Sequence, residues 1–274
     1  MNSQICSSQK TVVVLGPPRS GTSVTAGILE SLGVDMGNLR GADSENPKGY
    51  FEDKDFLSLG DDIYQAASPG SHGFKPPPIE NILRVKEQFE GRIKKLLEKR
   101  AEEARMRNWG WKATSTILTI EIFLPYLENP HFIVVFRNPL HIAESIVKYT
   151  KNKPFYNELN IFQALKIVNQ YYHGIYTFLH EHNELPLYFI SFEELTSDPV
   201  KETEGLARFL NMPVTPAQLE RIKRLITPKH EMLRLKKRFR RKERLRYMYR
   251  AIKSPHKFWG YLNEFISKFK IESS

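Results

Sequence analysis

The chain has 274 residues, of which 41% are hydrophobic and 12% aromatic, and this content suits an ordinary buried core and argues against wholesale disorder. Its single cysteine, Cys6, excludes an intrachain disulfide framework and a thiolate-rich zinc or iron–sulfur site. No segment approaches the roughly 20 consecutive apolar residues of a membrane span, and the N-terminus lacks the apolar core of a secretory signal. We therefore expect a protein of the cytoplasm.

The positive charge is concentrated near the C-terminus. The whole chain carries a net charge of +10, and residues 229–253, with twelve Lys or Arg and two acids, carry the same charge by themselves. The rest of the chain is close to neutral, which predicts a near-neutral body with one basic arm. We expect a disordered N-terminus (1–10), a domain over residues 11–228 and a basic helical extension (229–274).

Short β-branched runs alternate with segments of helical spacing. Strands are predicted at 11–15, 109–113, 131–136 and 187–192. Helices are predicted at 22–32, 51–66, 79–107, 116–127, 139–149, 160–182, 199–210 and 216–226. The polar face of the helix at 79–107 is expected to be solvated, and the Gly- and Pro-rich segment 67–78 to be a mobile loop or lid. The alternation predicts an α/β fold around a parallel sheet.

The segment Gly16–Ser23 (GPPRSGTS) lies between the first predicted strand and the first predicted helix. Its glycines allow a tight turn that aims backbone N–H groups inward, and the helix N-terminus adds a partial positive charge. With Arg19, Thr22 and Ser23 as side-chain donors, the segment predicts a cradle for a phosphate-like anion. The alternative is a turn that merely joins the strand to the helix.

The spacing of this loop is that of a Walker A loop, with two departures. Thr22 stands where that loop has its lysine, and the cation, Arg19, lies inside the loop. A nucleotide hydrolase also needs an aspartate at the end of a strand to hold Mg²⁺, whereas the two later strands run into Arg137 and Ser191. The pattern favours a phosphorylated ligand that is handled without metal.

A second anion site is predicted at Arg137, which follows a buried strand at the end where open α/β sheets place ligands. Ser145 comes eight residues later, just over two helical turns, so both side chains project the same way. An arginine and a serine hydroxyl on one face can bind a second phosphate. Taken singly, each residue favours a simpler interpretation: a surface salt bridge for Arg137 and a helix-packing hydroxyl for Ser145.

Three segments in order now resemble motifs of the sulfotransferases that use 3′-phosphoadenosine-5′-phosphosulfate (PAPS), in particular bacterial ones. Gly16–Ser23 resembles their 5′-phosphosulfate loop, FIVVFRNPLHIAESIVKY resembles their 3′-phosphate motif, and ISFEELTSDP resembles a later strand and turn. The resemblance implies a three-layer P-loop-type fold with a mostly parallel central sheet. It implies transfer of a sulfuryl group to an acceptor hydroxyl or amine without a metal, leaving adenosine 3′,5′-bisphosphate (PAP).

The resemblance also assigns residues by position. It gives the 5′-phosphosulfate to the loop residues Pro18, Arg19, Ser20, Gly21, Thr22 and Ser23, and the 3′-phosphate to Arg137 and Ser145. Arg19 with Lys112 would stabilise the charge on the leaving oxygen. Thr114 stands where many animal members carry a catalytic histidine, so we expect Glu52 to be the base, as in some bacterial members, with Asp53 as second choice. The alternative for both acids is capping of the helix that begins there.

Two other functions stay open at this point. One is a Mg²⁺–ATP-dependent small-molecule kinase with a degenerate P-loop, and the other is a non-catalytic protein that binds an anionic membrane or nucleic acid through the basic arm. A sulfotransferase would take a small-molecule, lipid or glycan acceptor and no nucleic acid. The arm would then contact the 3′-phosphate, an anionic acceptor or an anionic membrane surface, or would be a solvated helix. Four aromatic residues could line an acceptor pocket or pack in the core: Tyr171, Tyr172, Tyr176 and Phe178.

Overall fold

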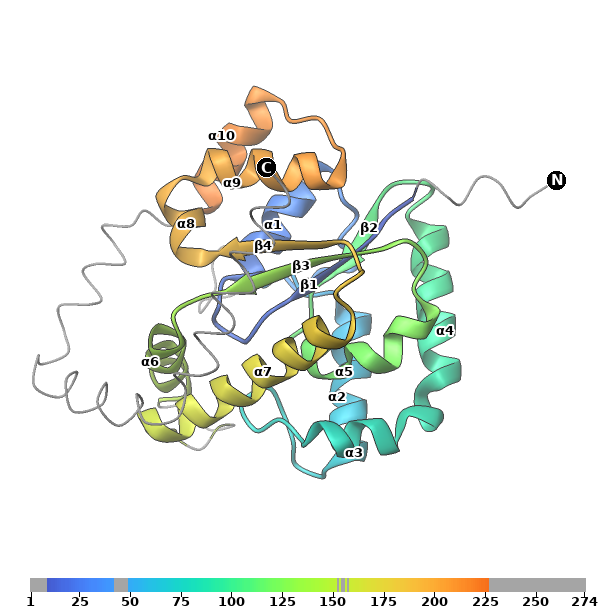
Figure 1. The fold of residues 1–274 in the computed structure, drawn as a ribbon, viewed down its shortest axis with the longest axis vertical. Coiled ribbons are helices and arrows are strands. Elements are labelled where there is room, and N and C mark those ends of the chain that lie inside the picture. Colours follow the sequence, from blue (N-terminus) through green and yellow to red (C-terminus); the bar gives the residue numbers. More distant parts are fainter. Residues whose placement is uncertain (1–8, 42–48, 152, 154–155, 157, 227–274) are drawn as a thin grey trace, which may run out of the picture. The chain divides into compact units, whose positions relative to one another are not determined.

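The computed structural model of the chain describes residues 9–41, 49–151, 153, 156 and 158–226 (Figure 1). The predicted basic arm, 229–253, lies outside the described residues, as does most of the predicted disordered N-terminus. The division into a domain ending at residue 228 and a helical extension therefore stays a prediction.

A four-stranded, fully parallel sheet forms the centre of the described part, in the order β2–β1–β3–β4. The strands are β1 (Thr11–Leu15), β2 (Trp109–Trp111), β3 (Pro130–Phe136) and β4 (Leu187–Ser191). All of β1 is buried, as expected for a β-branched central strand covered on both faces. The predicted α/β fold with a parallel sheet is confirmed.

The helices follow the predicted order. They are α1 (Thr22–Leu32), α2 (Lys54–Ala67), α3 (Ile79–Arg84), α4 (Lys86–Glu103), α5 (Thr116–Phe123), α6 (Pro139–Thr150), α7 (Ile161–Glu181), α8 (Phe192–Ser197), α9 (Pro199–Leu210) and α10 (Pro216–Leu225). Proline occupies the first position of α6, α9 and α10, where its missing N–H leaves no bond unmade. Gly33 ends α1 in the left-handed conformation, as the sequence suggested.

Several elements differ from the prediction: α2 begins at Lys54 instead of residue 51, and β2 ends at Trp111 instead of residue 113. The single helix expected at 79–107 is divided at Val85 into α3 and α4. The helix expected at 116–127 becomes a 3₁₀ turn at Leu124–Tyr126, because Pro125 has no N–H to continue the α-helical ladder. The short helix α8 was not predicted, although the Ser191 hydroxyl caps it by accepting from the Glu194 N–H.

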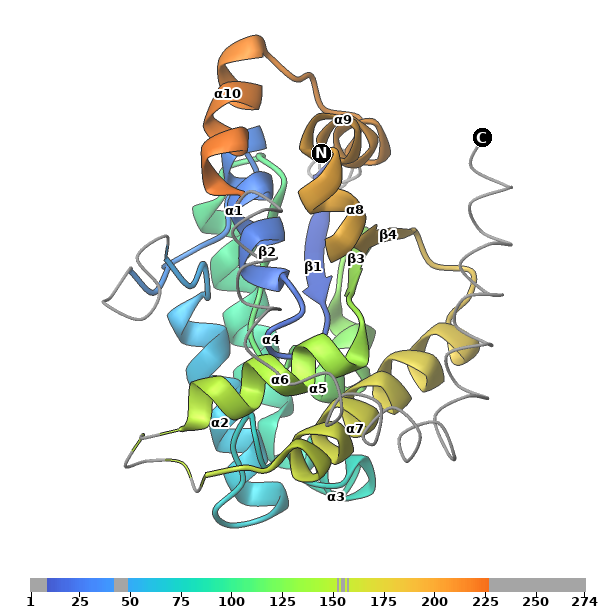
Figure 2. The same ribbon diagram turned by 90° about the vertical axis from the view of Figure 1, so that its left-hand side faces the viewer.

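Helices cover both faces of the sheet and give three layers. Figures 1 and 2 show α1 and α8–α10 on one face, and α2–α5 and α7 on the other. On the first face, Val12, Val14 and Ile133 pack with buried residues of α1, α9 and α10. The loops at the carboxyl ends of β1 and β3 therefore extend from a sheet that is packed on both faces. None of the helices within the described ranges is long and apolar enough to cross a bilayer.

An aromatic stack attaches α2 to the edge of the sheet. The Phe56 ring lies 4.2 Å from the Trp111 ring with an interplanar angle of 6°, and Trp109 and Phe123 lie beside them. Gly110 lies between the two tryptophans, where a Cβ atom would sit 1.9 Å from the Val12 carbonyl oxygen. Only glycine allows β2 to approach β1 this closely. The stack thus fixes α2 beside the short edge strand.

We predict that Phe56→Ala lowers the free energy of unfolding by about 3–5 kcal/mol, because it leaves a cavity against Trp111. The Phe56 side chain is 2% exposed, whereas Phe162 is 42% exposed. The matched control, Phe162→Ala, should change stability by less than about 0.5 kcal/mol. Urea unfolding followed by tryptophan fluorescence measures both. Equal midpoints for the two variants would contradict the role given to the stack.

Candidate active site

The loop Gly16–Ser23 turns sharply between β1 and α1. Arg19 has φ 69° and Gly21, the N-cap of α1, has φ 112°, so both adopt the left-handed conformation. A Cβ atom at Gly21 would lie 2.3 Å from the Phe192 ring. The position therefore requires glycine both for its positive φ and for this close approach. Within the described residues no side chain caps α1 and no acid stands in its first turn. The helix N-terminus therefore presents its positive end to a ligand.

A buried hydroxyl in this loop lacks a partner. Ser20 is fully buried, and its Oγ has no hydrogen-bond partner among the described residues. The Arg137 Nε is a second buried polar atom without such a partner. Native proteins satisfy nearly all buried polar groups, so these two donors fit an anion with several acceptor oxygens. The residues present thus suit a phosphate-bearing ligand.

The two predicted anion motifs meet in one site. Arg137 Nη1 donates to the Arg19 carbonyl oxygen at 2.9 Å, and Arg19 Nε donates to Ser145 Oγ at 3.2 Å. The Tyr172 hydroxyl accepts from the Arg137 N–H and donates to the Arg137 carbonyl oxygen. The Phe192 ring lies 4.5 Å from the Arg137 guanidinium carbon. Both loops are therefore held at a set spacing at the carboxyl ends of β1 and β3.

A buried ion pair lies beside the loop. Lys112 Nζ is 2.9 Å from Glu52 Oε1 and also donates to Ser23 Oγ at 3.2 Å. Thr114 Oγ1 donates to the same Glu52 oxygen at 2.8 Å. Glu52 and Lys112 are each 5% exposed. Lys112 thus joins the carboxylate of Glu52 to the phosphate loop.

The charge state of Glu52 follows from these neighbours. Burial acts to raise the pKa of Glu52, but the Lys112 ammonium and the hydrogen bonds from Lys112 and Thr114 outweigh it, and the net shift is downward from 4.5. Arg40, 4.0 Å from Glu52 Oε2, acts in the same direction. Glu52 is therefore ionised at neutral pH and can accept a proton.

Asp53 has a different position. Its carboxylate accepts from the N–H groups of Asp55 and Phe56, and so caps α2, and it also accepts from the Asn38 N–H. Burial raises its pKa above 3.8, against these hydrogen bonds and Arg100. The capping alternative thus describes Asp53, whereas the side chain of Glu52 turns to Lys112 and Thr114.

Arg100 is a residue that the sequence analysis missed. The polar face of the helix at 79–107 was expected to be solvated, which is wrong at this position, since Arg100 is 4% exposed. Its guanidinium lies 3.2 Å from Asp35 and 3.5 Å from Asp53. Arg100 continues the buried stripe of Phe89 and Ile93 at helical spacing, and this was the available signal. The network secures the start of α2, next to Glu52.

The loop at 67–78, expected to be mobile or a lid, is tied to two helices. Gln65 Nε2 of α2 donates to the Ser71 carbonyl at 2.6 Å. From α7, the Tyr171 hydroxyl donates to the Gly73 carbonyl and Gln170 Nε2 donates to the Pro77 carbonyl, each at 2.8 Å. Segments without regular structure are thus held in place by side chains that satisfy their backbone groups.

The four aromatic candidates of α7 divide between core and surface. Tyr171, Tyr172 and Phe178 are buried to within 1% and pack in the core. Tyr176 is 37% exposed, with its ring 6.0 Å from that of His180. Core packing is therefore the interpretation that holds for three of the four.

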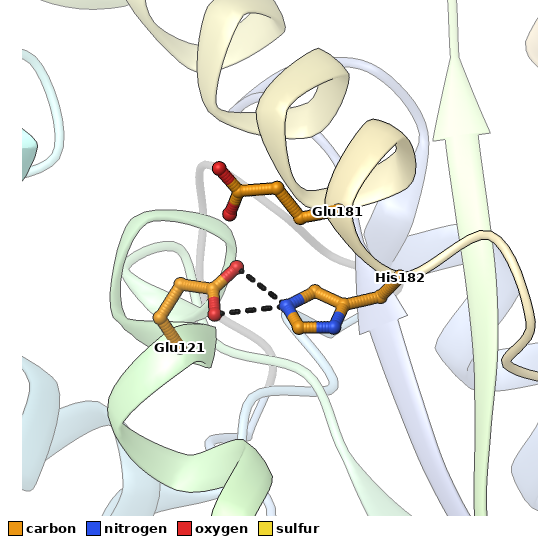
Figure 3. A group of neighbouring side chains, drawn as sticks. All are labelled: Glu121, Glu181 and His182. Atoms are coloured by element: carbon orange, nitrogen blue, oxygen red, sulfur yellow. Dashed lines mark hydrogen bonds and ion pairs between the residues drawn. The ribbon is translucent and has the colours of Figure 1, made fainter.

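One group of side chains in the described ranges has the composition of a metal site. Figure 3 shows Glu121 of α5 facing His182, which follows Glu181 at the end of α7. One possible ligand atom from each residue lies within 4.8 Å of the others. His182 Nε2 is 3.0 Å from Glu121, which accounts for the pair without an ion. The sequence analysis did not find this group, because Glu121 and His182 are 61 residues apart in the sequence. It lies before β4 begins, away from the carboxyl ends of the strands.

Comparisons with known proteins bear on the family and the fold. The sequence profile of the sulfotransferase family matches residues 11–216. The structure resembles the sulfotransferase domain of the Synechococcus PCC 7002 olefin synthase, with a TM-score of 0.50, 15% identity and coverage of 80% of this chain and 78% of that one. It also resembles the sulfotransferase domain from the curacin biosynthetic pathway, with a TM-score of 0.49, 17% identity and coverage of 77% and 76%. A search of curated proteins finds no match.

We predict that Lys112→Met lowers the free energy of unfolding at pH 7 by about 3 kcal/mol, since it leaves a buried carboxylate without its cation. In the wild type the pKa of Glu52 is below 4.5, so its contribution is present above that pH and is lost as the pH falls through the folded value. In the variant, burial without Lys112 raises the pKa. The difference between the two proteins should therefore begin to shrink above pH 4.5, where Glu52 of the variant takes up its proton, and should go on shrinking below 4.5 until Glu52 of the wild type is protonated.

Denaturant unfolding at several pH values measures this difference. Lys94→Met is the control, because Lys94 forms an exposed pair with Glu90 and should change stability little. A difference between wild type and Lys112→Met that is constant with pH would contradict the pairing with Glu52.

Proposed function

Because this chain belongs to the sulfotransferase family, we propose that it transfers a sulfuryl group from PAPS to an acceptor hydroxyl or amine. The observation that carries the proposal is the continuity of the site: Lys112 joins Glu52 to Ser23 of the phosphate loop, and Arg19 joins that loop to Ser145. A base, a cation and two anion-binding motifs thus lie within one chain of contacts.

The donor would be held by its two phosphate-bearing ends. The loop residues Pro18, Arg19, Ser20, Gly21, Thr22 and Ser23 would receive the 5′-phosphosulfate, with the Ser20 hydroxyl as a buried donor in need of an acceptor. Arg137 and Ser145 would hold the 3′-phosphate through charge-assisted hydrogen bonds. Phe192 and Tyr172 support this arrangement, because they hold the Arg137 side chain and backbone in place.

Glu52 and Lys112 would divide the chemistry between them. Glu52, ionised at neutral pH, accepts the proton of the acceptor as its oxygen or nitrogen attacks sulfur in line with the leaving phosphate oxygen. As Glu52 becomes neutral, Lys112 loses its counter-charge and is free to stabilise the negative charge that develops on that leaving oxygen, together with Arg19. Positioning and electrostatics supply the catalysis, and none of these residue roles calls for a metal.

The acceptor and the surroundings of the protein belong to the same proposal. We expect a small-molecule, lipid or glycan acceptor, and a protein of the cytoplasm. The basic arm, residues 229–253, would attract an anionic acceptor or an anionic membrane surface. The kinase alternative draws no support from the site, because β3 and β4 run into Arg137 and Ser191 where a Mg²⁺-binding aspartate would stand.

We predict that PAP binds the protein without metal and that Arg137→Ala weakens this binding about 10- to 100-fold, the loss expected for a charged hydrogen-bond donor. Isothermal titration calorimetry with PAP, and separately with ATP and Mg²⁺, measures it. Arg221→Ala is the matched control, because Arg221 pairs with Glu30 on the surface, and its affinity for PAP should equal that of the wild type. Binding of ATP only with Mg²⁺ would favour the kinase, and equal weakening by both variants would contradict the assigned site.

We predict that Glu52→Gln lowers kcat for sulfuryl transfer about 10²- to 10⁴-fold, because the amide cannot accept the proton. The affinity for PAP should stay within about twofold, which shows that the variant is folded and separates the loss of a base from the loss of the donor site. Transfer from PAPS to an acceptor panel, followed by the release of PAP, measures the rate. An unchanged kcat would exclude Glu52 as the base.

A further inference from the structure

The two carboxylate oxygens of Glu52 have different surroundings. Oε1 accepts from Lys112 Nζ at 2.9 Å and from Thr114 Oγ1 at 2.8 Å, and so has both of its lone pairs engaged. Within the described ranges Oε2 accepts no hydrogen bond, and its charged neighbour, Arg40 Nη1, lies 4.0 Å away. Oε2 is therefore the oxygen with lone pairs left for a proton.

The two donors to Oε1 differ in charge and in their other contacts. Lys112 is a cation that also donates to Ser23 Oγ of the phosphate loop at 3.2 Å, so it is shared between Glu52 and the loop. Thr114 is neutral, and a neutral carboxyl group still offers its carbonyl oxygen to a hydroxyl donor. The contact from Thr114 therefore persists when Glu52 takes up a proton and the attraction of Lys112 to Glu52 falls.

The direction of the Thr114 hydroxyl is set by the loop at 67–78. Threonine branches at Cβ, so fixing its methyl group also fixes its hydroxyl. The methyl carbon Cγ2 lies against Gly73, where a Cβ atom would sit only 3.0 Å from it. Gly73 is itself held by the Tyr171 hydroxyl, which donates to its carbonyl oxygen at 2.8 Å. The tied loop thus braces Thr114 from the side opposite Glu52.

The backbone of Glu52 is fixed as well. Its carbonyl oxygen accepts from the Arg40 N–H at 2.7 Å, and the next residue, Asp53, caps α2. The carboxylate is therefore held at its backbone and at Oε1, which leaves Oε2 in one orientation.

From this geometry we propose that Thr114 is a positioning residue, which orients Glu52 so that Oε2 receives the proton of the acceptor. The inference rests on the proposed sulfotransferase function, and it assigns the proton transfer to one atom. It also gives a task to the tied loop, which holds Thr114 in place without contacting Glu52 through any hydrogen bond of the described residues.

The transfer then balances as follows. The proton of the acceptor passes to Oε2, and the oxygen or nitrogen of the acceptor forms a bond to sulfur. The bond between sulfur and the 5′-phosphate oxygen of PAPS breaks, and its electron pair leaves on that oxygen as PAP. Oε1 of the neutral Glu52 keeps the hydrogen bond from Thr114, and Glu52 later returns its proton to solvent.

The charges around Glu52 are the same in every variant that removes only the Thr114 hydroxyl. Burial raises the pKa of Glu52, whereas Lys112 and Arg40 lower it. Asp61 of α2 adds a negative charge nearby, and its own pKa is raised by burial and by Glu52. A change in the titration of Glu52 on loss of the hydroxyl therefore reports the contact with Thr114.

NMR titration of the Glu52 carboxyl carbon in the full chain, labelled with ¹³C at the glutamate side-chain carboxyl, tests the contact. Glu52→Gln identifies the signal. Thr114→Val should tighten proton binding by Glu52 about 10-fold, because a hydrogen bond to the charged form is lost. Thr119→Val is the matched control, since the Thr119 hydroxyl donates to the Ser115 carbonyl in the same region, and it should leave the titration unchanged.

Kinetics separate positioning from basicity. The probe is PAPS with the acceptor of highest turnover in the panel used for Glu52→Gln. Thr114→Val makes Glu52 a stronger base, which by itself would raise kcat at pH 7. We expect kcat to fall about 10-fold instead, because the base is misplaced, with the affinity for PAP within about twofold of the wild type. Thr114→Ser keeps the hydroxyl and should restore the titration and most of kcat.

Each outcome decides the proposal. An unchanged titration in Thr114→Val, or an equal change in Thr119→Val, overturns it, and so does a kcat at pH 7 that stays the same or rises. A Thr114→Ser variant as impaired as Thr114→Val overturns it too, because the hydroxyl would not be the cause. If PAP binds in these cases, the sulfotransferase proposal stands. If the folded protein binds no PAP, both proposals fall.

Discussion

The ion pair between Lys112 and Glu52 is the interaction on which the site depends. It connects three segments that are far apart in the sequence, because Lys112 follows β2, Glu52 precedes α2, and Ser23 belongs to the loop after β1. Buried ion pairs contribute little to stability, since the cost of removing both charges from water offsets their attraction. This pair is retained in a buried place with hydrogen bonds on both partners, which fits a role in chemistry better than a role in folding.

The scaffold around the pair holds its two members in place. Phe56 stacks on Trp111 and sets α2 against the edge strand, so that the residue before the helix and the residue after the strand meet. Arg100 holds Asp53 and Asp35, and so secures the turn at the start of α2. The aromatic stack and the Arg100 ion pairs each include a neighbour of the pair in the sequence, since Trp111 precedes Lys112 and Asp53 follows Glu52. A site built on rigid elements in this way keeps its geometry when the ligand is absent.

Much of the fold followed from local pattern. Each of the four strands and most of the helices lie where β-branched runs and helical spacing predicted them, because burial on one face or both imposes a period that can be read along the chain. The differences have a common cause. Arg100 was assigned to a solvated helix face but is buried, and the loop at 67–78, expected to be a mobile loop or lid, has backbone carbonyls that accept from distant side chains. In both cases partners distant in sequence, Asp53 and Tyr171, decide the environment.

The sequence alone determined that a glycine-rich loop stands between a strand and a helix, and it predicted a phosphate site there because such a loop carries its donors in its own backbone. It also indicated that Arg137 and Ser145 form a second anion motif, because helical spacing places both on one side. Only the tertiary structure decided that Glu52 faces Lys112 while Asp53 caps a helix, and that the rings of His72, Phe74, Tyr149 and Tyr156 come into contact. Neighbouring acids have the same local chemistry, and aromatic rings carry no signal of their partners. Long-range packing alone distinguishes them.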